Sequence, residues 1–120
     1  MYSERLLDHF KNPRNVGELP APAITLEVSN PACGDILRLS VRLEGGKVQE
    51  ARYKVRGCTA SIATGSALTE LLTGKTREEV AELNAGIIET AVDGLAPESK
   101  HAAVLAFDGV KALLRRWISL

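Results

Sequence analysis

Four side chains in this sequence could bind a metal ion, and two of them lie in the segment PACGD at Pro31–Asp35. Cys33 offers a thiolate, and Asp35 offers a carboxylate two residues further on. Cys58 and His101 offer a second thiolate and an imidazole. Two soft ligands, one hard ligand and one borderline ligand suit a transition metal, zinc or iron above all. The first hypothesis is therefore a metal site formed by Cys33, Asp35, Cys58 and His101.

Each of these residues also has an ordinary structural interpretation. A cysteine is often simply buried, an aspartate after a glycine usually belongs to a turn, and a histidine in the first turn of a helix usually lies at the surface. Cys33 and Cys58 do not form a C-x-x-C pair, so their spacing is weak evidence for a metal or sulfur site. His9 is interpreted as structural. From the residues alone, both interpretations of the candidate site stay open.

The composition limits the kinds of protein to which such a site could belong. The 120 residues suffice for one ordinary domain with its own core, so we expect a single domain spanning 1–120. The 15 basic and 15 acidic side chains cancel, which gives no support for nucleic acid or an anionic membrane as a partner. No signal-peptide core is apparent, and no stretch reaches the ~18 apolar residues of a membrane span. We therefore expect a cytoplasmic protein, whose two cysteines are more often free, catalytic or metal-binding than joined in a structural disulfide.

Alternating apolar residues predict a β-hairpin around Gly45 and Gly46. A three-residue loop at Gly45–Lys47 would place apolar residues opposite one another on one face. The pairs are Leu37 with Val55, Leu39 with Tyr53 and Val41 with Ala51. A two-residue loop would instead oppose Leu37 to Lys54, so we predict the three-residue loop.

The same register predicts that candidate ligands far apart in the sequence converge. Extending the ladder places Cys58 across from Gly34, with the two Cα atoms ~5 Å apart. Gly34 lies between Cys33 and Asp35. A helix is predicted from about Ser61, so Cys58 lies just before a helix N-terminus, where the helix dipole and free amides favour a thiolate over a thiol.

The remaining predicted elements give a mixed pattern of helices and strands. Before the hairpin we expect a short helix at Ser3–Phe10 and a strand at Ile24–Val28. The helix that begins near Ser61 should end at Gly74, and a capping box at Thr76–Glu79 opens a further short helix. Loop with room for one helical turn follows at Asn84–Pro97, and then a long amphipathic helix at Glu98–Ile118. His101 lies in the first turn of this last helix.

Four blocks of the sequence resemble one protein family in their order and spacing. They are DHFKNPRNVG (Asp8–Gly17), NPACGD (Asn30–Asp35), ARYKVRGCTASIATGSALTELLTGKT (Ala51–Thr76) and HAAVLAFDGVKALL (His101–Leu114). Together they are similar to the IscU and NifU-type iron-sulfur cluster assembly scaffolds over nearly the whole chain. The resemblance implies a compact α+β domain, in which a three-stranded antiparallel sheet packs with helices that include a long C-terminal one.

The resemblance also implies a function and a set of partners. Members of the family build a [2Fe-2S] cluster from iron and from sulfur that a cysteine desulfurase delivers, and they pass it to apo iron-sulfur acceptor proteins. They act as scaffolds, so we expect no enzyme and no catalytic residues. The stretch LAPESKH differs from the Leu-Pro-Pro-Val-Lys motif that some members present to an Hsp70-type chaperone, so this chaperone is a doubtful partner.

Transferred residue by residue, Cys33, Asp35 and Cys58 match the first two cluster cysteines of the family and the aspartate beside the first. His101 matches a histidine of many members, but Ala102 stands where the third cluster cysteine is expected. The four remaining groups could bind one tetrahedral zinc ion, or a [2Fe-2S] cluster more labile than an all-cysteine cluster.

Two functions therefore stay open. One is a scaffold that binds iron, a [2Fe-2S] cluster or zinc and takes part in cluster assembly. The other is a homologue that assembles no cluster and acts as a zinc-bound regulator or a desulfurase-interaction protein. A homodimer is one way in which a site with two cysteines could complete a cluster.

Overall fold

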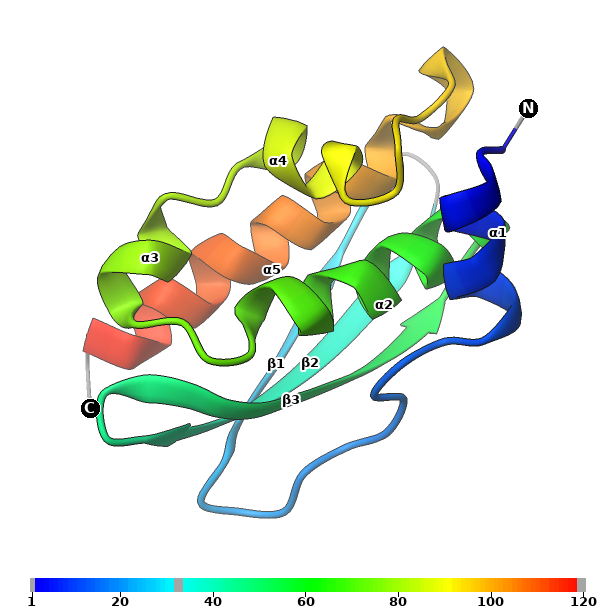
Figure 1. The fold of residues 1–120 in the computed structure, drawn as a ribbon. Coiled ribbons are helices and arrows are strands. Elements are labelled where there is room, and N and C mark those ends of the chain that lie inside the picture. The colour runs from blue at the N-terminus through cyan, green and yellow to red at the C-terminus, as the bar shows by residue number, and fades with distance from the viewer. Residues whose placement is uncertain (1, 32–33, 119–120) are drawn as a thin grey trace.

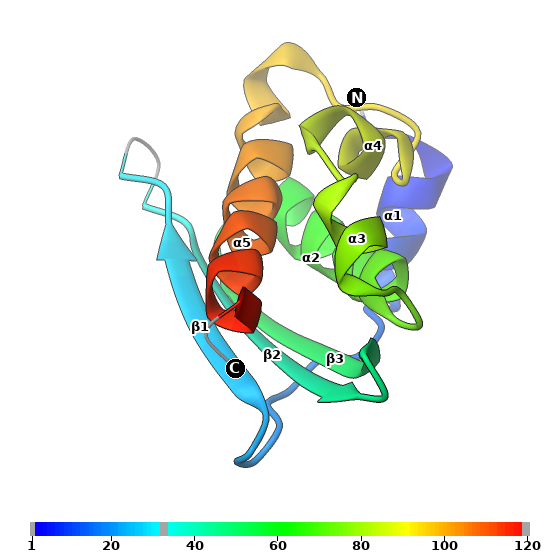
Figure 2. The same ribbon diagram turned by 90° about the vertical axis from the view of Figure 1, so that its left-hand side faces the viewer.

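The computed structural model describes residues 2–31 and 34–118 of the chain. A three-stranded antiparallel sheet in the order β1-β2-β3 carries the helices on one face, as Figures 1 and 2 show. The elements are, in chain order, α1 (Glu4–Lys11), β1 (Ile24–Ser29), β2 (Ile36–Glu44), β3 (Lys47–Arg56), α2 (Thr59–Leu72), α3 (Arg77–Ala81), α4 (Ala85–Thr90), the 3₁₀ helix η1 (Pro97–Ser99) and α5 (His101–Ile118). This confirms the α+β class, the three-stranded sheet and the long C-terminal helix.

Two helices lie directly on the sheet. The helix α2 packs over β3, and α5 packs over β1 and β2, while α1 lies against α2 and the short helices α3 and α4 lie against α5 (Figures 1 and 2). The N-termini of α2 and α5 meet at the end of the sheet where β3 ends and β2 begins. The fold therefore brings three chain segments, far apart in the sequence, to one end of the sheet.

The register of the hairpin is the predicted one over most of its length. Leu37, Leu39 and Val41 pair with Val55, Tyr53 and Ala51, and the three β2 residues are almost completely buried. The apolar face of β2 thus fixes the register, because a slip by one residue would turn this face to solvent.

The predicted three-residue loop is wrong. The structure pairs Glu44 with Lys47 across a two-residue turn, Gly45 and Gly46, whose φ angles of 61° and 77° are those that a tight hairpin turn requires. The register shifts by one residue next to Arg42, which leaves Gln49 as the extra residue of a β-bulge. The bulge restores the apolar pairing that a two-residue loop alone would have lost.

Helix α2 approaches β3 closely because of a glycine. A Cβ atom on Gly65 would lie 2.6 Å from ring carbons of Tyr53, so any larger side chain would push the helix off the strand. The hydroxyl of Tyr53 donates to the carbonyl oxygen of Ile62 at 2.7 Å, and burial raises the pKa of Tyr53 to about 12. These contacts fix the first turns of α2 relative to the sheet.

Helix boundaries agree with the predictions at most ends. Helix α1 begins after Ser3, whose hydroxyl accepts from the backbone N–H of Leu6, and α3 begins with the predicted capping box of Thr76 and Glu79. Helix α2 begins two residues earlier than predicted, directly after Cys58. The long helix α5 begins at His101 instead of residue 98, because a 3₁₀ turn occupies the preceding residues.

Residues 84–97 hold a longer helix than the one helical turn predicted within this loop. Six of them form α4, whose N-cap Asn84 accepts from the backbone N–H of Ile87 at 2.9 Å, and Ile88 lies in the core. A six-residue helix carries too few apolar positions to give a visible period, so packing of Ile88 makes it a helix. No helix in the described ranges 2–31 and 34–118 is long and apolar enough to cross a membrane.

His9 has a structural setting. It is buried, its Nδ1 lies 2.8 Å from Oγ of Ser66 on α2, and its Nε2 lies 3.6 Å from a carboxylate oxygen of Glu70. The backbone N–H of Arg14 donates to the same Ser66 hydroxyl at 2.9 Å. His9 and Ser66 therefore join α1 and the chain that follows it to α2.

Candidate metal centre

Three of the four candidate ligands lie together at the end of the sheet described above. Asp35 comes directly before β2, Cys58 directly before α2, and His101 is the first residue of α5. Their ligand atoms all lie within 4.8 Å of one another. Sγ of Cys58 is 3.5 Å from Nε2 of His101 and 3.7 Å from Oδ2 of Asp35, and Nε2 of His101 is 3.5 Å from the same Oδ2.

The fourth candidate, Cys33, lies outside the described residues. The predicted convergence is confirmed for Asp35 and Cys58, which belong to segments that pair as the end of the β2–β3 ladder. His101 completes the group from a third segment.

Asp35 is positioned by a turn and by a glycine. The backbone N–H of Gly34 donates to the carbonyl oxygen of Asn30 at 2.7 Å, and the backbone N–H of Asn30 donates to the carbonyl oxygen of Asp35 at 2.9 Å. Gly34 has a φ angle of 76°. Across the ladder, a Cβ atom on Gly57 would lie 2.7 Å from Cγ of Asp35. Asp35 is 6% exposed, so its carboxylate lies in a space that the missing Gly57 side chain leaves open.

Cys58 is the N-cap residue of α2, and its backbone carbonyl accepts from the N–H of Ile62 at 3.1 Å. Its side chain makes no capping hydrogen bond. The thiol is free and the residue is exposed. The sulfur therefore remains available to the groups around it and to a reagent from solvent.

His101 is the candidate ligand from α5, and 27% of its side chain is accessible. The 3₁₀ turn at Pro97–Ser99 directs the chain into α5 so that the first residue of the helix faces Asp35 and Cys58. Ala102, where a third cluster cysteine was expected, is 1% exposed and belongs to the core. Its methyl group offers no ligand.

Ser61 is a fourth polar group of the site, and the sequence analysis missed it. Its hydroxyl donates to Oδ2 of Asp35 at 2.5 Å and its Oγ lies 3.4 Å from Sγ of Cys58. The sequence signal for Ser61 is its spacing, because residues three apart lie on one face of a helix and Ser61 follows Cys58 by three residues at a helix start.

The donor set fits a transition metal. A thiolate, an imidazole and a carboxylate oxygen are the ligands that zinc takes in tetrahedral sites, and thiolate with imidazole also holds iron in iron-sulfur clusters. The three groups are close enough to share one ion after small side-chain shifts, because all pairs lie within 4.8 Å.

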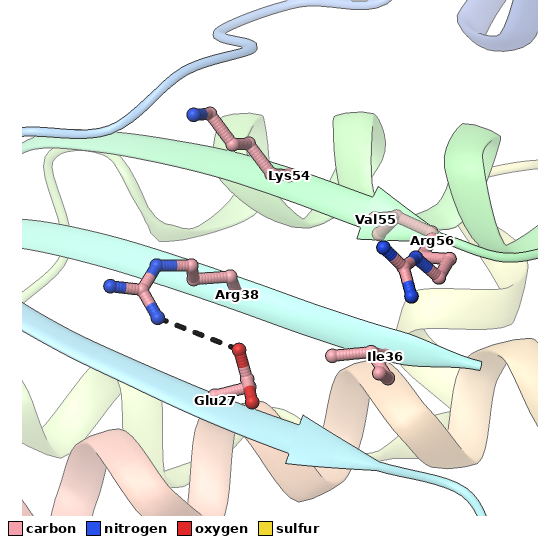
Figure 3. Close-up of a pocket in the computed structure, with 6 residues that line it drawn as sticks. All are labelled: Glu27, Ile36, Arg38, Lys54, Val55 and Arg56. Atoms are coloured by element: carbon pink, nitrogen blue, oxygen red, sulfur yellow. Dashed lines mark hydrogen bonds and ion pairs between the residues drawn. The ribbon is translucent and has the colours of Figure 1, made fainter. Parts of the chain in front are cut away.

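A basic depression lies near this centre, on the face of the sheet away from the helices. Its volume is about 390 Å³, and Arg38 donates to a carboxylate oxygen of Glu27 at 3.5 Å. Figure 3 shows Arg38, Lys54 and Arg56 among the residues that line it. Asp35, Cys58 and His101 do not line it. The metal centre and the depression are therefore separate features of the described surface.

Comparisons with known proteins agree with this fold and site. The model of the family described as the NifU-like N terminal domain matches residues 1–118. The chain is 42% identical over 119 residues to the iron-sulfur cluster assembly scaffold protein IscU of Azotobacter vinelandii, which covers 95% of this chain and 91% of that protein. It is 37% identical over 118 residues to a protein of Drosophila melanogaster called iron-sulfur cluster assembly enzyme IscU, with 95% and 76% covered.

Among solved structures, the fold is similar to a candidate iron-sulfur cluster assembly scaffold protein for the SUF system from Fervidobacterium islandicum. The TM-score is 0.80 at 25% sequence identity, over 94% of this chain and 96% of the other. The family match spans nearly all of the chain, and the close relatives match it over most of their own length. The chain therefore belongs to the NifU-like N-terminal domain family.

Proposed function

We propose that this chain, as a single domain spanning 1–120, is an iron-sulfur cluster assembly scaffold. The observation that carries the proposal is the convergence of Asp35, Cys58 and His101, whose ligand atoms lie within 4.8 Å of one another. Relatives that are 35–42% identical to the chain over 111–119 aligned residues and are named as assembly scaffolds support it. The proposed ligands of iron or of a [2Fe-2S] cluster are Cys33, Asp35, Cys58 and His101.

The same ligands suit zinc in the absence of a cluster. Zinc accepts mixed sulfur, nitrogen and oxygen ligands, whereas clusters prefer thiolates. A cluster held by two thiolates, a carboxylate and an imidazole should be more labile than an all-cysteine cluster. Lability suits a protein whose cluster is cargo to be handed on, so the scaffold proposal needs no third thiolate at Ala102.

The partners follow from the chemistry of assembly. Sulfur delivery needs an accessible thiol, and the exposed Cys58 can receive it from a cysteine desulfurase. Cluster release needs ligands at the surface, and His101 is 27% exposed, which allows an apo acceptor protein to approach. In this proposal the protein is a scaffold without turnover, although its Drosophila relative is called an assembly enzyme. The proposed location is the cytoplasm, because that reducing compartment keeps a free thiol such as that of Cys58 reduced.

A second candidate function is that of a zinc-bound regulator that docks on a desulfurase without building a cluster. The observation that favours it is Ala102, a buried residue without a ligand atom where the family has its third cysteine. This candidate predicts desulfurase binding that survives in the Cys33→Ala, Cys58→Ala double variant. Loss of binding in that variant would contradict it.

Anaerobic reconstitution tests the scaffold proposal. The protein is incubated with ferrous iron, cysteine and a cysteine desulfurase, and the visible absorption of sulfur-to-iron charge transfer is followed. The proposal predicts such absorption in the wild-type protein and its loss in Cys58→Ala. As a matched control, Thr64→Val removes a hydroxyl that bonds within α2 to the carbonyl oxygen of Ala60, and it should behave as wild type. Absence of the absorption at every protein concentration would contradict the proposal.

A further inference from the structure

The hydroxyl of Ser61 makes the shortest contact of the metal centre, and Ser61 is not among the proposed ligands. It lies 2.5 Å from Oδ2 of Asp35, and Ser61 is only 2% exposed. An ionised carboxylate can only accept hydrogen bonds, whereas a serine hydroxyl carries one proton. The proton of Ser61 is therefore donated to Asp35, and the 3.4 Å contact of the same oxygen with Sγ of Cys58 is not a bond that Ser61 donates.

The oxygen that Ser61 contacts is the one that faces the other ligands. Oδ2 of Asp35 lies 3.5 Å from Nε2 of His101 and 3.7 Å from Sγ of Cys58. A carboxylate oxygen has two lone pairs, so it can accept from Ser61 and still bind a metal ion. The hydrogen bond thus holds the oxygen in the direction in which a shared ion would lie.

Ser61 is the contact of this carboxylate that can persist when the site is loaded. The side chains of Ser61, Cys58 and His101 contact Oδ2, and the last two would turn to the ion as ligands. Ser61 sits on the rigid first turn of α2, which the bond from Tyr53 to Ile62 fixes to the sheet. A donor on such a support pre-orients a ligand at little entropic cost.

We infer that Ser61 is a positioning residue of the metal centre, which raises the affinity of the site for a divalent metal by orienting Oδ2 of Asp35. The inference rests on the proposed role of Asp35 as a ligand. Hydrogen bonds to metal ligands typically contribute 10–100-fold in metal affinity. Loss of the Ser61 hydroxyl should therefore weaken metal binding by about 10-fold or more.

Cobalt(II) binding to the metal-free protein under anaerobic conditions tests this inference. Its visible d–d bands report the geometry of the ligands, and its near-ultraviolet charge transfer reports the thiolate. Ser61→Ala should bind cobalt(II) about 10-fold more weakly and shift the d–d bands, while it keeps the thiolate charge transfer. Thr64→Val, which removes a buried hydroxyl on the same helix, should change neither property.

A double-variant comparison separates positioning from a general effect on folding. If Ser61 acts through Asp35, Ser61→Ala should cost no further affinity in an Asp35→Ala background. An additive loss in the double variant, or equal affinity and spectra for Ser61→Ala and wild type, would overturn the inference. Failure of the wild-type protein to bind cobalt(II) with thiolate charge transfer would instead contradict the proposed function itself.

Discussion

The carboxylate of Asp35 and the bare Cα of Gly57 lie against each other across the end of the β2–β3 ladder. A Cβ atom on Gly57 would come within 2.7 Å of Cγ and 2.8 Å of Oδ2 of Asp35. A glycine directly after β3 thus leaves the space for the carboxylate of the proposed ligand directly before β2. The backbone N–H of Asn30 donates to the carbonyl oxygen of Asp35 at 2.9 Å, which ties the backbone of Asp35 to the end of the preceding segment.

The first prediction follows from this contact. Gly57→Ala should displace the Asp35 carboxylate and weaken cobalt(II) binding by more than about 10-fold, an effect at least as large as loss of a hydrogen bond to a ligand. It should also cost about 1–3 kcal/mol in the free energy of unfolding, because the added methyl group overpacks its surroundings. Cobalt titration and urea denaturation measure the two effects.

Gly109 provides the matched control for this variant. A Cβ there would lie 3.0 Å from a methyl carbon of Leu37 in the core, so Gly109→Ala alters core packing away from the site and should leave metal affinity unchanged. Equal metal affinities for wild type, Gly57→Ala and Gly109→Ala would show that Asp35 needs no such space.

Removal of the imidazole gives the second prediction. His101→Ala should reduce cobalt(II) affinity by more than the roughly 10–100-fold expected for a residue that only supports a ligand. Val104, one turn further along α5 and 48% exposed, offers the control, since Val104→Ala alters the same helix surface without removing a ligand. If both variants bind cobalt(II) alike, His101 is not a ligand.

Much of the site could be predicted because apolar pairing determines the hairpin register. The burial of Leu37 and Leu39 on one face sets the ladder, and the ladder brings Asp35 to Cys58. The loop length was wrong because a β-bulge at Gln49 changes the count of residues without changing the faces. An apolar pattern carries no information about such an insertion.

Contacts between side chains were the other part that the sequence did not reveal. The bond from Ser61 to Asp35 and the space at Gly57 depend on how two segments approach in three dimensions. Neither a small residue nor a serine on a helix face is unusual enough to attract attention alone. Helix α4 is longer than the one helical turn allowed for there, since its stability comes from packing of Ile88 and not from a periodic pattern.

The third prediction concerns pH and His9. Burial, and then the charge of Arg14, lowers the pKa of His9 below its ordinary value of 6.5, with Glu70 acting in the opposite direction. The unfolded chain therefore takes up the proton first as the pH falls. The stability that the neutral His9 provides is fully present above 6.5 and decreases as the pH falls from 6.5 toward the lowered pKa.

Urea denaturation at several pH values measures this effect. The free energy of unfolding of wild type minus that of His9→Gln should shrink between about pH 7 and about pH 5.5, where an ordinary histidine titrates. The subtraction removes the contribution of His101, which both proteins contain. A difference that stays constant over this range would contradict the assignment of His9.

The fourth prediction concerns the helix cap of α3. The hydroxyl of Thr76 accepts from the backbone N–H of Glu79 at 3.2 Å. In return, the carboxylate of Glu79 accepts from the backbone N–H of Thr76 at 2.9 Å. Thr76→Ala should lower the free energy of unfolding by about 1 kcal/mol, with no change in metal affinity. Glu79→Gln retains an acceptor at this position, so it should cost less. Equal urea midpoints for wild type and Thr76→Ala would count against the cap.

The central claim is that Asp35, Cys58 and His101 hold a metal in one site of a scaffold. Its most direct test is the content of iron, zinc and acid-labile sulfide in protein purified without oxygen or chelator, with Cys58→Ala purified in parallel. We expect iron with equimolar sulfide in the wild-type protein and loss of both in the variant, whereas zinc near one per chain without sulfide would favour the zinc-bound regulator over the scaffold. Wild-type protein that carries neither metal, or a variant that retains the metal of wild type, would contradict it.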